Sequence, residues 1–271
     1  MSDKTMSENL LTQHTFQVGD QTFRGKVVAL DKDGLLFDHH SFIRALNQER
    51  IRAARTKYGI NPDIVIDWMT EIGIAAHIGP DGEPVADACL PDGTAILASI
   101  EDEVVISGVF FMHSLKIPWP EARAMALEVH TTADDALRWQ DVLTTHQGCP
   151  EIFSRLRKKG VPYGIVTLDT SQRVREMIDM VDESESLSFI LSSSEITNCK
   201  PDPEAIIKTA DLFGVSCNEI IMIGDLPVDM EMANLAGAVG VAVPEGSFFE
   251  EELRKKASYV CKTLDDFIIL D

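Results

Sequence analysis

The second half of the chain alternates between short apolar runs and longer amphipathic stretches. Apolar runs bounded by turn residues predict buried strands, and apolar residues three or four positions apart predict helices. The predicted strands cover 163–167, 189–192, 219–223 and 238–243, and the predicted helices cover 150–159, a stretch from 170, 203–213, 227–236 and residues after 243 up to 270. This alternation is typical of a parallel sheet covered by helices on both faces.

The first half is mostly helical in pattern. The segment 15–23 predicts a short hairpin, and the apolar run 26–30 predicts a first strand of the same parallel sheet. Four helical patterns follow, at 41–58, 62–77, 95–115 and 120–145. Glycines and prolines interrupt the stretch 77–94, which we expect to be irregular. Residues 1–14 are polar and predicted to be loose.

These patterns predict an α/β fold: a Rossmann-like parallel sheet into which a mostly helical unit is inserted after the first strand. We place the α/β core at 1–39 and 146–271 and the helical cap domain at 40–145. A chain of 271 residues is long enough for one large domain, or for a core with an inserted one.

Composition narrows the range of partners and compartments. The net charge of −20 argues against a nucleic-acid backbone or an anionic membrane as the main partner. The five cysteines are scattered and form no Cys-x-x-Cys pair, which favours reduced thiols over a disulfide framework or a zinc site. No apolar run has the length of a membrane span, and the first residues lead into no apolar signal core. We therefore expect a cytoplasmic protein.

Two carboxylates follow the first predicted strand. Asp31 and Asp33 stand one residue apart, directly after Leu30 and before Gly34. Open α/β sheets bind ligands at the carboxyl ends of their strands, so both acids are expected where ligands bind. Two like charges about 4 Å apart repel by roughly 4 kcal/mol at an effective dielectric constant near 20. Such a pair therefore calls for a proton or a nearby cation.

The other predicted strands end in matching chemistry. Thr167 ends one strand, Lys200 follows the next, and Asp225 ends a third, with Asp229 one helical turn further on. Carboxylate oxygens without histidine or cysteine suit Mg²⁺, and a lysine with a hydroxyl suits a phosphate. The set therefore indicates phosphoryl transfer.

At this point the sequence resembles the haloacid dehalogenase superfamily, in particular its phosphatase-like members with a helical cap after the first strand, such as phosphoglycolate phosphatases and β-phosphoglucomutases. The four stretches that carry the resemblance, in order, are Asp31-Lys32-Asp33-Gly34, Thr167, Lys200-Pro201-Asp202-Pro203, and Gly224-Asp225 with Asp229. The resemblance covers about 25–40 and 146–271. The cap matches only in position and helical character.

The resemblance implies a role for each matched acid. Asp31 would be the nucleophile that forms an aspartyl-phosphate, and Asp33 would protonate the leaving group and later activate water. Mg²⁺ would be held by the Asp31 carboxylate, the Asp33 backbone carbonyl and Asp225. Asp229 would support the metal shell or orient Lys200.

The resemblance also implies a phosphate site and a lid. Thr167, Leu168 and Lys200 would hold the phosphoryl oxygens, with Lys200 counted among the catalytic residues. The cap would close over the substrate and exclude water. We therefore expect a phosphoric monoester hydrolase that acts with Mg²⁺ on a small phosphorylated metabolite, such as phosphoglycolate or a sugar phosphate.

Two other functions stay open. Dehalogenase relatives lack an acid at the position of Asp33, but sugar-phosphate mutases keep both acids. The mutases place a histidine twelve residues after the nucleophile, where this chain has Ile43, although His39 and His40 are close by. The third reading is a regulatory protein that keeps the fold without turnover, against which the complete set of acids and lysine argues.

The chain departs from the family pattern in a few places. Lys32 stands where an apolar residue is usual, Leu35 where a small hydroxyl residue is usual, and Leu168 where a polar one is frequent. Candidate anion contacts in the cap are Arg44, Arg52, His77 and His113. The sequence leaves open the substrate, the oligomeric state, and the roles of Lys32 and of 77–94.

Overall fold

A computed structural model describes residues 11–90, 92–181, 183–244, 246 and 248–271, and the polar segment 1–10 lies outside the described residues. The chain forms two compact units. The first comprises the chain up to Leu35, Gln147–Thr167 and the part from Val181 onward, and the second comprises Leu36–His146 and Leu168–Met180. The predicted boundaries of core and cap stay a prediction. The second unit contains 168–180, which that prediction assigns to the core.

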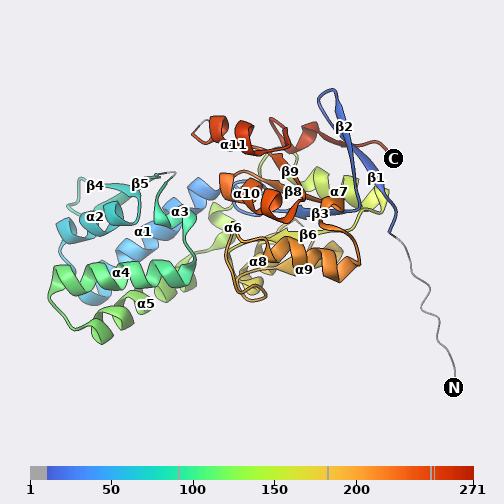
Figure 1. Ribbon diagram of the computed structural model, residues 1–271. Helices are drawn as coiled ribbons and strands as arrows, with labels where there is room; N and C mark the ends of the chain where they lie inside the picture. The colour runs from blue at the N-terminus through green and yellow to red at the C-terminus, as the bar shows by residue number, and fades with distance from the viewer. Residues whose placement is uncertain (1–10, 91, 182, 245, 247) are drawn as a thin grey trace, which may run out of the picture. The chain divides into compact units, whose positions relative to one another are not determined.

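A six-stranded parallel sheet forms the centre of the first unit (Figure 1). Its strands, in spatial order, are β10 (Tyr259–Val260), β9 (Val239–Ala242), β8 (Ile220–Gly224), β3 (Val27–Leu30), β6 (Tyr163–Val166) and β7 (Phe189–Leu191). Every pairing between neighbours is parallel. All four residues of β3 are fully buried, as expected for a strand between two others and under helices. The predicted α/β fold class is confirmed.

Helices cover this sheet on both faces. Helices α9 (Glu204–Phe213) and α10 (Pro227–Ala236) pack in one apolar cluster with Val27 and Ala29 of β3. Side chains alternate between faces along a strand, so Tyr163, which pairs with Val28, lies on the opposite face. There it contacts Phe153 of α7 (Cys149–Lys159), with ring centroids 5.8 Å apart.

The two ends of the described chain meet in a small antiparallel sheet. It consists of β1 (His14–Val18), β2 (Gln21–Gly25) and β11 (Phe267–Ile269), with β1 in the middle. The predicted hairpin is confirmed. The prediction of helix from 243 to 270 is wrong beyond α11 (Glu250–Lys256), because β10 and β11 gain their hydrogen bonds from distant strands.

The second unit is a helical assembly with one hairpin. Its elements are α1 (His39–Tyr58), α2 (Pro62–Glu71), β4 (Ile74–Ile78), β5 (Pro84–Cys89), α3 (Thr94–Leu97), α4 (Ile100–Leu115), α5 (Trp119–Ala136), α6 (Trp139–Val142) and α8 (Ser171–Asp179). Helices α1, α4 and α5 pack against one another. In the part of the chain that the structure describes, none of the helices combines the length and apolar character of a membrane span.

The hairpin corrects two predictions. The helix predicted at 62–77 ends at Glu71, and the stretch 77–94, predicted as irregular, contains most of the hairpin of β4 and β5. Gly73 sits between helix and strand with a φ of 83°, and its Cα lies so close to Gly93 that a Cβ on either glycine would overlap the other. The Gly73 carbonyl accepts from the N–H of Leu90 at 2.7 Å. The two glycines therefore allow the base of the hairpin to close.

Candidate active site

Strand register brings the predicted acids to one edge of the parallel sheet. Leu30 of β3 lies opposite Ile165 of β6 and Ile223 of β8. Asp31 therefore leaves β3 where its neighbours also end, and its N–H donates to the Ile223 carbonyl at 2.9 Å. Asp225 follows directly after β8. A separation of 194 residues (225 − 31) in the chain thus becomes adjacency in space.

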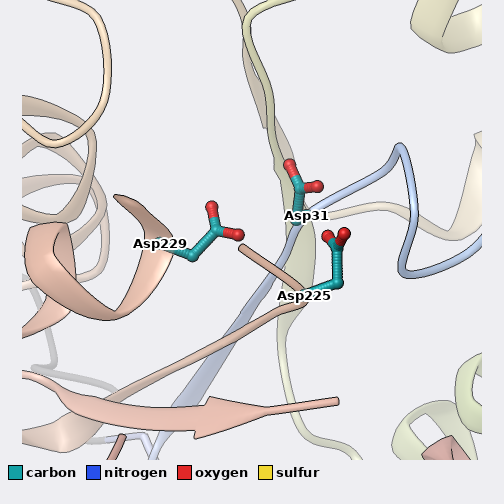
Figure 2. A group of neighbouring side chains, drawn as sticks. All are labelled: Asp31, Asp225 and Asp229. Atoms are coloured by element: carbon teal, nitrogen blue, oxygen red, sulfur yellow. The ribbon is translucent and has the colours of Figure 1, made fainter. Parts of the chain in front are cut away.

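Three carboxylates converge at this edge. Figure 2 shows Asp31 and Asp225 pointing the same way from neighbouring strand ends, with Asp229 approaching from α10. One oxygen from each lies within 4.8 Å of the others. The three residues are only 6%, 4% and 1% exposed, so water screens their mutual repulsion poorly.

Asp229 is held in place by its own helix. Its Oδ2 accepts the N–H of Leu226 at 3.1 Å, which satisfies one of the unpaired donors at the start of α10. Gly224 makes room for it, because a Cβ at that position would overlap the Asp229 carboxylate. The Gly-Asp pair at the end of β8 and the acid one turn later therefore form one packing unit.

Lys200 supplies a positive charge to this group. Its Nζ lies 2.5 Å from Oδ1 of Asp31 and 2.7 Å from Oδ1 of Asp229, and its side chain is 4% exposed. The loop before it is fixed by Glu204, whose carboxylate accepts the N–H groups of Thr197 at 3.0 Å and Asn198 at 2.7 Å. The lysine thus reaches two acids across a buried, well-ordered approach.

Electrostatics at the edge are unbalanced. Burial raises the pKa of Asp31 to about 6, with Lys200 opposing the rise and Asp229 and Asp33 adding to it. Burial alone would lower the pKa of Lys200, but the charges of Asp229 and Asp31 outweigh it and leave that pKa above its usual value. Three buried acids thus share one ammonium group, and further positive charge would favour their ionised forms.

This donor set fits a magnesium ion. Carboxylate oxygens are the ligands that Mg²⁺ prefers, and the cluster of Asp31, Asp225 and Asp229 contains no histidine or cysteine. The excess of negative charge over Lys200 is what a divalent cation would offset. The fit therefore rests on donor chemistry and charge together.

The side chain of Asp33 has a different partner. Its Oδ1 lies 2.5 Å from Nζ of Lys32, and it is not one of the three clustered acids. Lys32 itself is fully buried, whereas the Asp33 side chain is 22% exposed. The two acids that flank Lys32 in sequence therefore contact different lysines.

The predicted phosphate contacts lie in two units. Thr167 ends the sheet segment of the first unit, is 2% exposed, and donates its N–H to the Leu191 carbonyl at 3.1 Å. Leu168 is half-buried and belongs to the second unit. The described first unit thus brings together Asp31, Lys200, Asp225 and Asp229, and keeps the Asp33 carboxylate on Lys32.

The cap candidates named from sequence are surface residues. Arg44 and His113 are exposed, Arg52 contacts Glu49 at 2.5 Å, and His77 contacts Asp87 at 2.7 Å. Such exposed pairs contribute little to stability and show no convergence on a common site.

Sequence reasoning missed the buried charges of the helical unit. Arg50 is 2% exposed and makes two hydrogen bonds to Glu103, at 3.2 and 2.8 Å, with a third to Asn47 at 3.1 Å. A signal was present: Arg50 continues the apolar stripe of α1 that runs through Phe42 and Leu46.

Comparisons with known proteins agree with this geometry. A family model for haloacid dehalogenase-like hydrolases matches residues 26–237. Over 103 residues the chain is 26% identical to phosphoglycolate phosphatase of Escherichia coli strain K12, which covers 38% of this chain and 41% of that protein. The chain thus matches less than half the length of this curated relative.

Two solved structures share the fold. A predicted phosphoglycolate phosphatase from Haemophilus somnus has a TM-score of 0.64 at 15% identity, covering 89% of this chain and 96% of that one. A β-phosphoglucomutase from Clostridium difficile has a TM-score of 0.54 at 17% identity, covering 89% and 92%. At these identities the likeness concerns the fold alone.

Proposed function

The chain belongs to the haloacid dehalogenase-like hydrolases, and from this premise we propose that it is a Mg²⁺-dependent phosphatase of a small phosphorylated metabolite, such as phosphoglycolate or a sugar phosphate. The observation that carries the proposal is the buried group of Asp31, Asp225 and Asp229 with Lys200 in contact with Asp31. A carboxylate nucleophile, acids for a metal and a cation for phosphoryl oxygens meet in one place.

In the first step, a carboxylate oxygen of Asp31 attacks phosphorus and the bond from phosphorus to the leaving oxygen breaks. Asp33 gives its proton to that oxygen, so an alcohol departs and an aspartyl-phosphate forms on Asp31. Lys200 and Thr167 contact the phosphoryl oxygens and offset their charge. Leu168 is the proposed third contact of that group.

In the second step, Asp33 accepts a proton from water while the water oxygen attacks phosphorus. The bond from phosphorus to Asp31 breaks, which restores the carboxylate and releases inorganic phosphate. Asp33 ends the cycle protonated, as it began. Asp31 must be ionised at the start of each cycle.

The proposed ligands of the metal are the Asp31 carboxylate, the Asp33 backbone carbonyl and Asp225, with Asp229 in support. The charge that Mg²⁺ supplies when bound offsets the charge of the transferring phosphoryl group. It also opposes the burial that raises the pKa of Asp31 to about 6.

The test is release of inorganic phosphate from a panel of phosphorylated metabolites, with Mg²⁺ and with EDTA. We expect release that depends on Mg²⁺ in the wild-type protein and a loss of at least about 10³-fold in Asp31→Asn, because an amide cannot form the phosphoenzyme. Phosphate release that survives Asp31→Asn would contradict the proposal.

A sugar phosphomutase is the second candidate. The shared fold with a β-phosphoglucomutase and the presence of both Asp31 and Asp33 favour it. Ile43, a buried residue where the mutases have histidine, counts against it. Isomerisation of a hexose 1-phosphate without net phosphate release would decide for the mutase. No conversion of any substrate would decide for a non-catalytic regulatory protein.

The proposed partner is the small metabolite alone, without nucleic acid or membrane, and the proposed location is cytoplasmic. All five cysteines, which lie among the described residues, are free thiols, and three of them are buried. Such usage is typical of a reducing compartment.

A further inference from the structure

Lys32 stands out among the lysines of the described chain. Its side chain is 0% exposed, so its ammonium group does not reach water as lysines at the edge of a core usually do. Its Nζ lies 2.5 Å from Oδ1 of Asp33. The position lies between the two acids that the proposed function uses for nucleophilic attack and for proton transfer.

A buried ammonium group is a costly way to fill this position. Removing a charge from water is unfavourable, and a buried ion pair is often no more stable than an apolar side chain of the same size. Methionine has a similar length and would fill the space without a charge. Stability alone therefore does not explain a lysine here, whereas a demand for one orientation of Asp33 does.

The two acids are held by separate cations. Lys200 contacts Asp31 at 2.5 Å and also Asp229 at 2.7 Å, while Lys32 contacts Asp33. The Asp33 side chain is 22% exposed, so without an ion pair it would have room to change rotamer. A charge-assisted bond to one oxygen restricts that freedom.

We propose that Lys32 is a positioning residue that fixes the Asp33 carboxylate for proton transfer to and from the leaving group. The inference rests on the proposed function, since it assigns a task to the same acid. Lys32 acts through Asp33 and touches neither the nucleophile's cation nor the clustered acids in any printed contact. Its removal should therefore impair the proton-transfer steps and spare phosphoryl binding.

The first test compares Lys32→Met with wild type on phenyl phosphate and 4-nitrophenyl phosphate. Phenolate is the poorer leaving group, so its departure depends more on a positioned acid. We expect kcat to fall about 10²-fold for phenyl phosphate and several-fold less for 4-nitrophenyl phosphate, with KM nearly unchanged for both. Lys32→Arg should restore part of the loss. Equal losses on both substrates would overturn the proposal.

A double-mutant cycle tests whether the effect passes through Asp33. In the Asp33→Asn background, Lys32→Met should reduce turnover of 4-nitrophenyl phosphate by less than about 2-fold, because the group it positions is already gone. Full additivity would overturn the proposal. The matched control is Lys26→Met, which breaks the contact of Lys26 with Glu219 at the opposite end of β3 and should leave the ratio between the two substrates unchanged.

A structural readout separates this inference from the proposed function. In crystal structures of the wild type and Lys32→Met, we expect the Asp33 carboxylate to be fixed in the first and displaced or in several rotamers in the second. An unchanged carboxylate would overturn the inference whatever the activity. A wild-type protein without phosphatase activity would refute the proposed function, and the crystal structures would still decide the role of Lys32.

Discussion

The sheet edge of the first unit and the interior of the second both bury charged side chains, and they neutralise them differently. At the edge, three buried acids share one lysine, and burial raises the pKa of Asp31 to about 6. In the helical unit, Arg50 meets Glu103 one to one through two hydrogen bonds. The first group has excess negative charge, whereas the second is balanced within itself.

This difference separates two uses of buried charge. A balanced pair needs nothing from outside, so it ties helices together and specifies their packing. An unbalanced group is stable only together with a proton, a metal ion or a substrate, which is typical of a functional site. The balanced pair should therefore respond to mutation through stability, and the unbalanced group through activity and metal binding.

The largest effect is expected for Lys200→Met, which removes the cation from the unbalanced group. Phosphate release from the best substrate should fall by about 10³-fold, because phosphoryl oxygens lose their fixed positive charge and two buried acids lose their partner. The measurement is steady-state phosphate release with saturating Mg²⁺. Lys158→Met, at an exposed position of α7, should leave the rate unchanged. Comparable losses in both variants would contradict the comparison.

The second effect breaks the balanced pair. Glu103→Gln leaves Arg50 buried without its counter-charge and should lower the free energy of unfolding of the helical unit by about 3 kcal/mol. Tryptophan fluorescence during urea unfolding reports on this unit, because the three tryptophans of the chain, at 68, 119 and 139, all lie in it.

The matched control for this variant is Glu49→Gln. Glu49 also contacts an arginine, but the Arg52 side chain is 62% exposed. Its loss should change the free energy of unfolding by less than about 0.5 kcal/mol. If Glu103→Gln proves as harmless as Glu49→Gln, the Arg50–Glu103 pair does not hold the helices together.

The third prediction concerns metal binding at the unbalanced group. Mg²⁺ at about 100 times its Kd should stabilise the wild-type protein by about 2.7 kcal/mol. Asp225→Asn should abolish this gain, and in EDTA it should be no less stable than wild type because it removes one of three repelling acids. Thermal unfolding with and without Mg²⁺ measures both. Equal stabilisation of wild type and variant would place the metal elsewhere.

The smallest effect is a pH dependence inside the helical unit. Burial, with a contribution from Arg50, lowers the pKa of His130 to about 2, while Ser107 contacts its Nε2 at 3.1 Å. Below pH 6.5 the unfolded chain binds a proton that the folded one refuses, so stability falls as pH falls. The loss should be about 1 kcal/mol between pH 6.5 and about pH 5.5.

His130→Gln provides the control for this dependence. It keeps an acceptor for Ser107 but has no proton to gain, so the slope of unfolding free energy against pH should be smaller by up to one proton. Tryptophan fluorescence in urea at several pH values gives the slope. An identical slope in wild type and variant would show that His130 is already protonated or is not the responsible group.

Local sequence predicted much of the molecule correctly. The alternation after Cys149 gave four strands and their helices, because each element there has its own apolar period and its own turn residues. The apolar run ending at Leu30 likewise identified β3. Asp31, Lys200 and Asp225 were predicted as one group from their places after strands, and these three do meet.

Where prediction failed, the deciding contacts were distant in sequence. Ile74–Ile78 reads as a continuation of α2 and becomes strand because β5 supplies its hydrogen bonds. Phe267–Ile269 reads as helix and becomes strand because it pairs with β1 at the other end of the chain. Local periodicity carries no information about such partners.

The sequence by itself therefore determined which residues could do chemistry and which edge of the sheet would carry them. Only the tertiary structure decided how the charges pair: Lys200 with Asp31 and Asp229, and Lys32, buried, with Asp33. The physical reason is that burial and ion pairing depend on which side chains meet across the fold. Residue type sets what a group can do, and its neighbours set its charge and orientation.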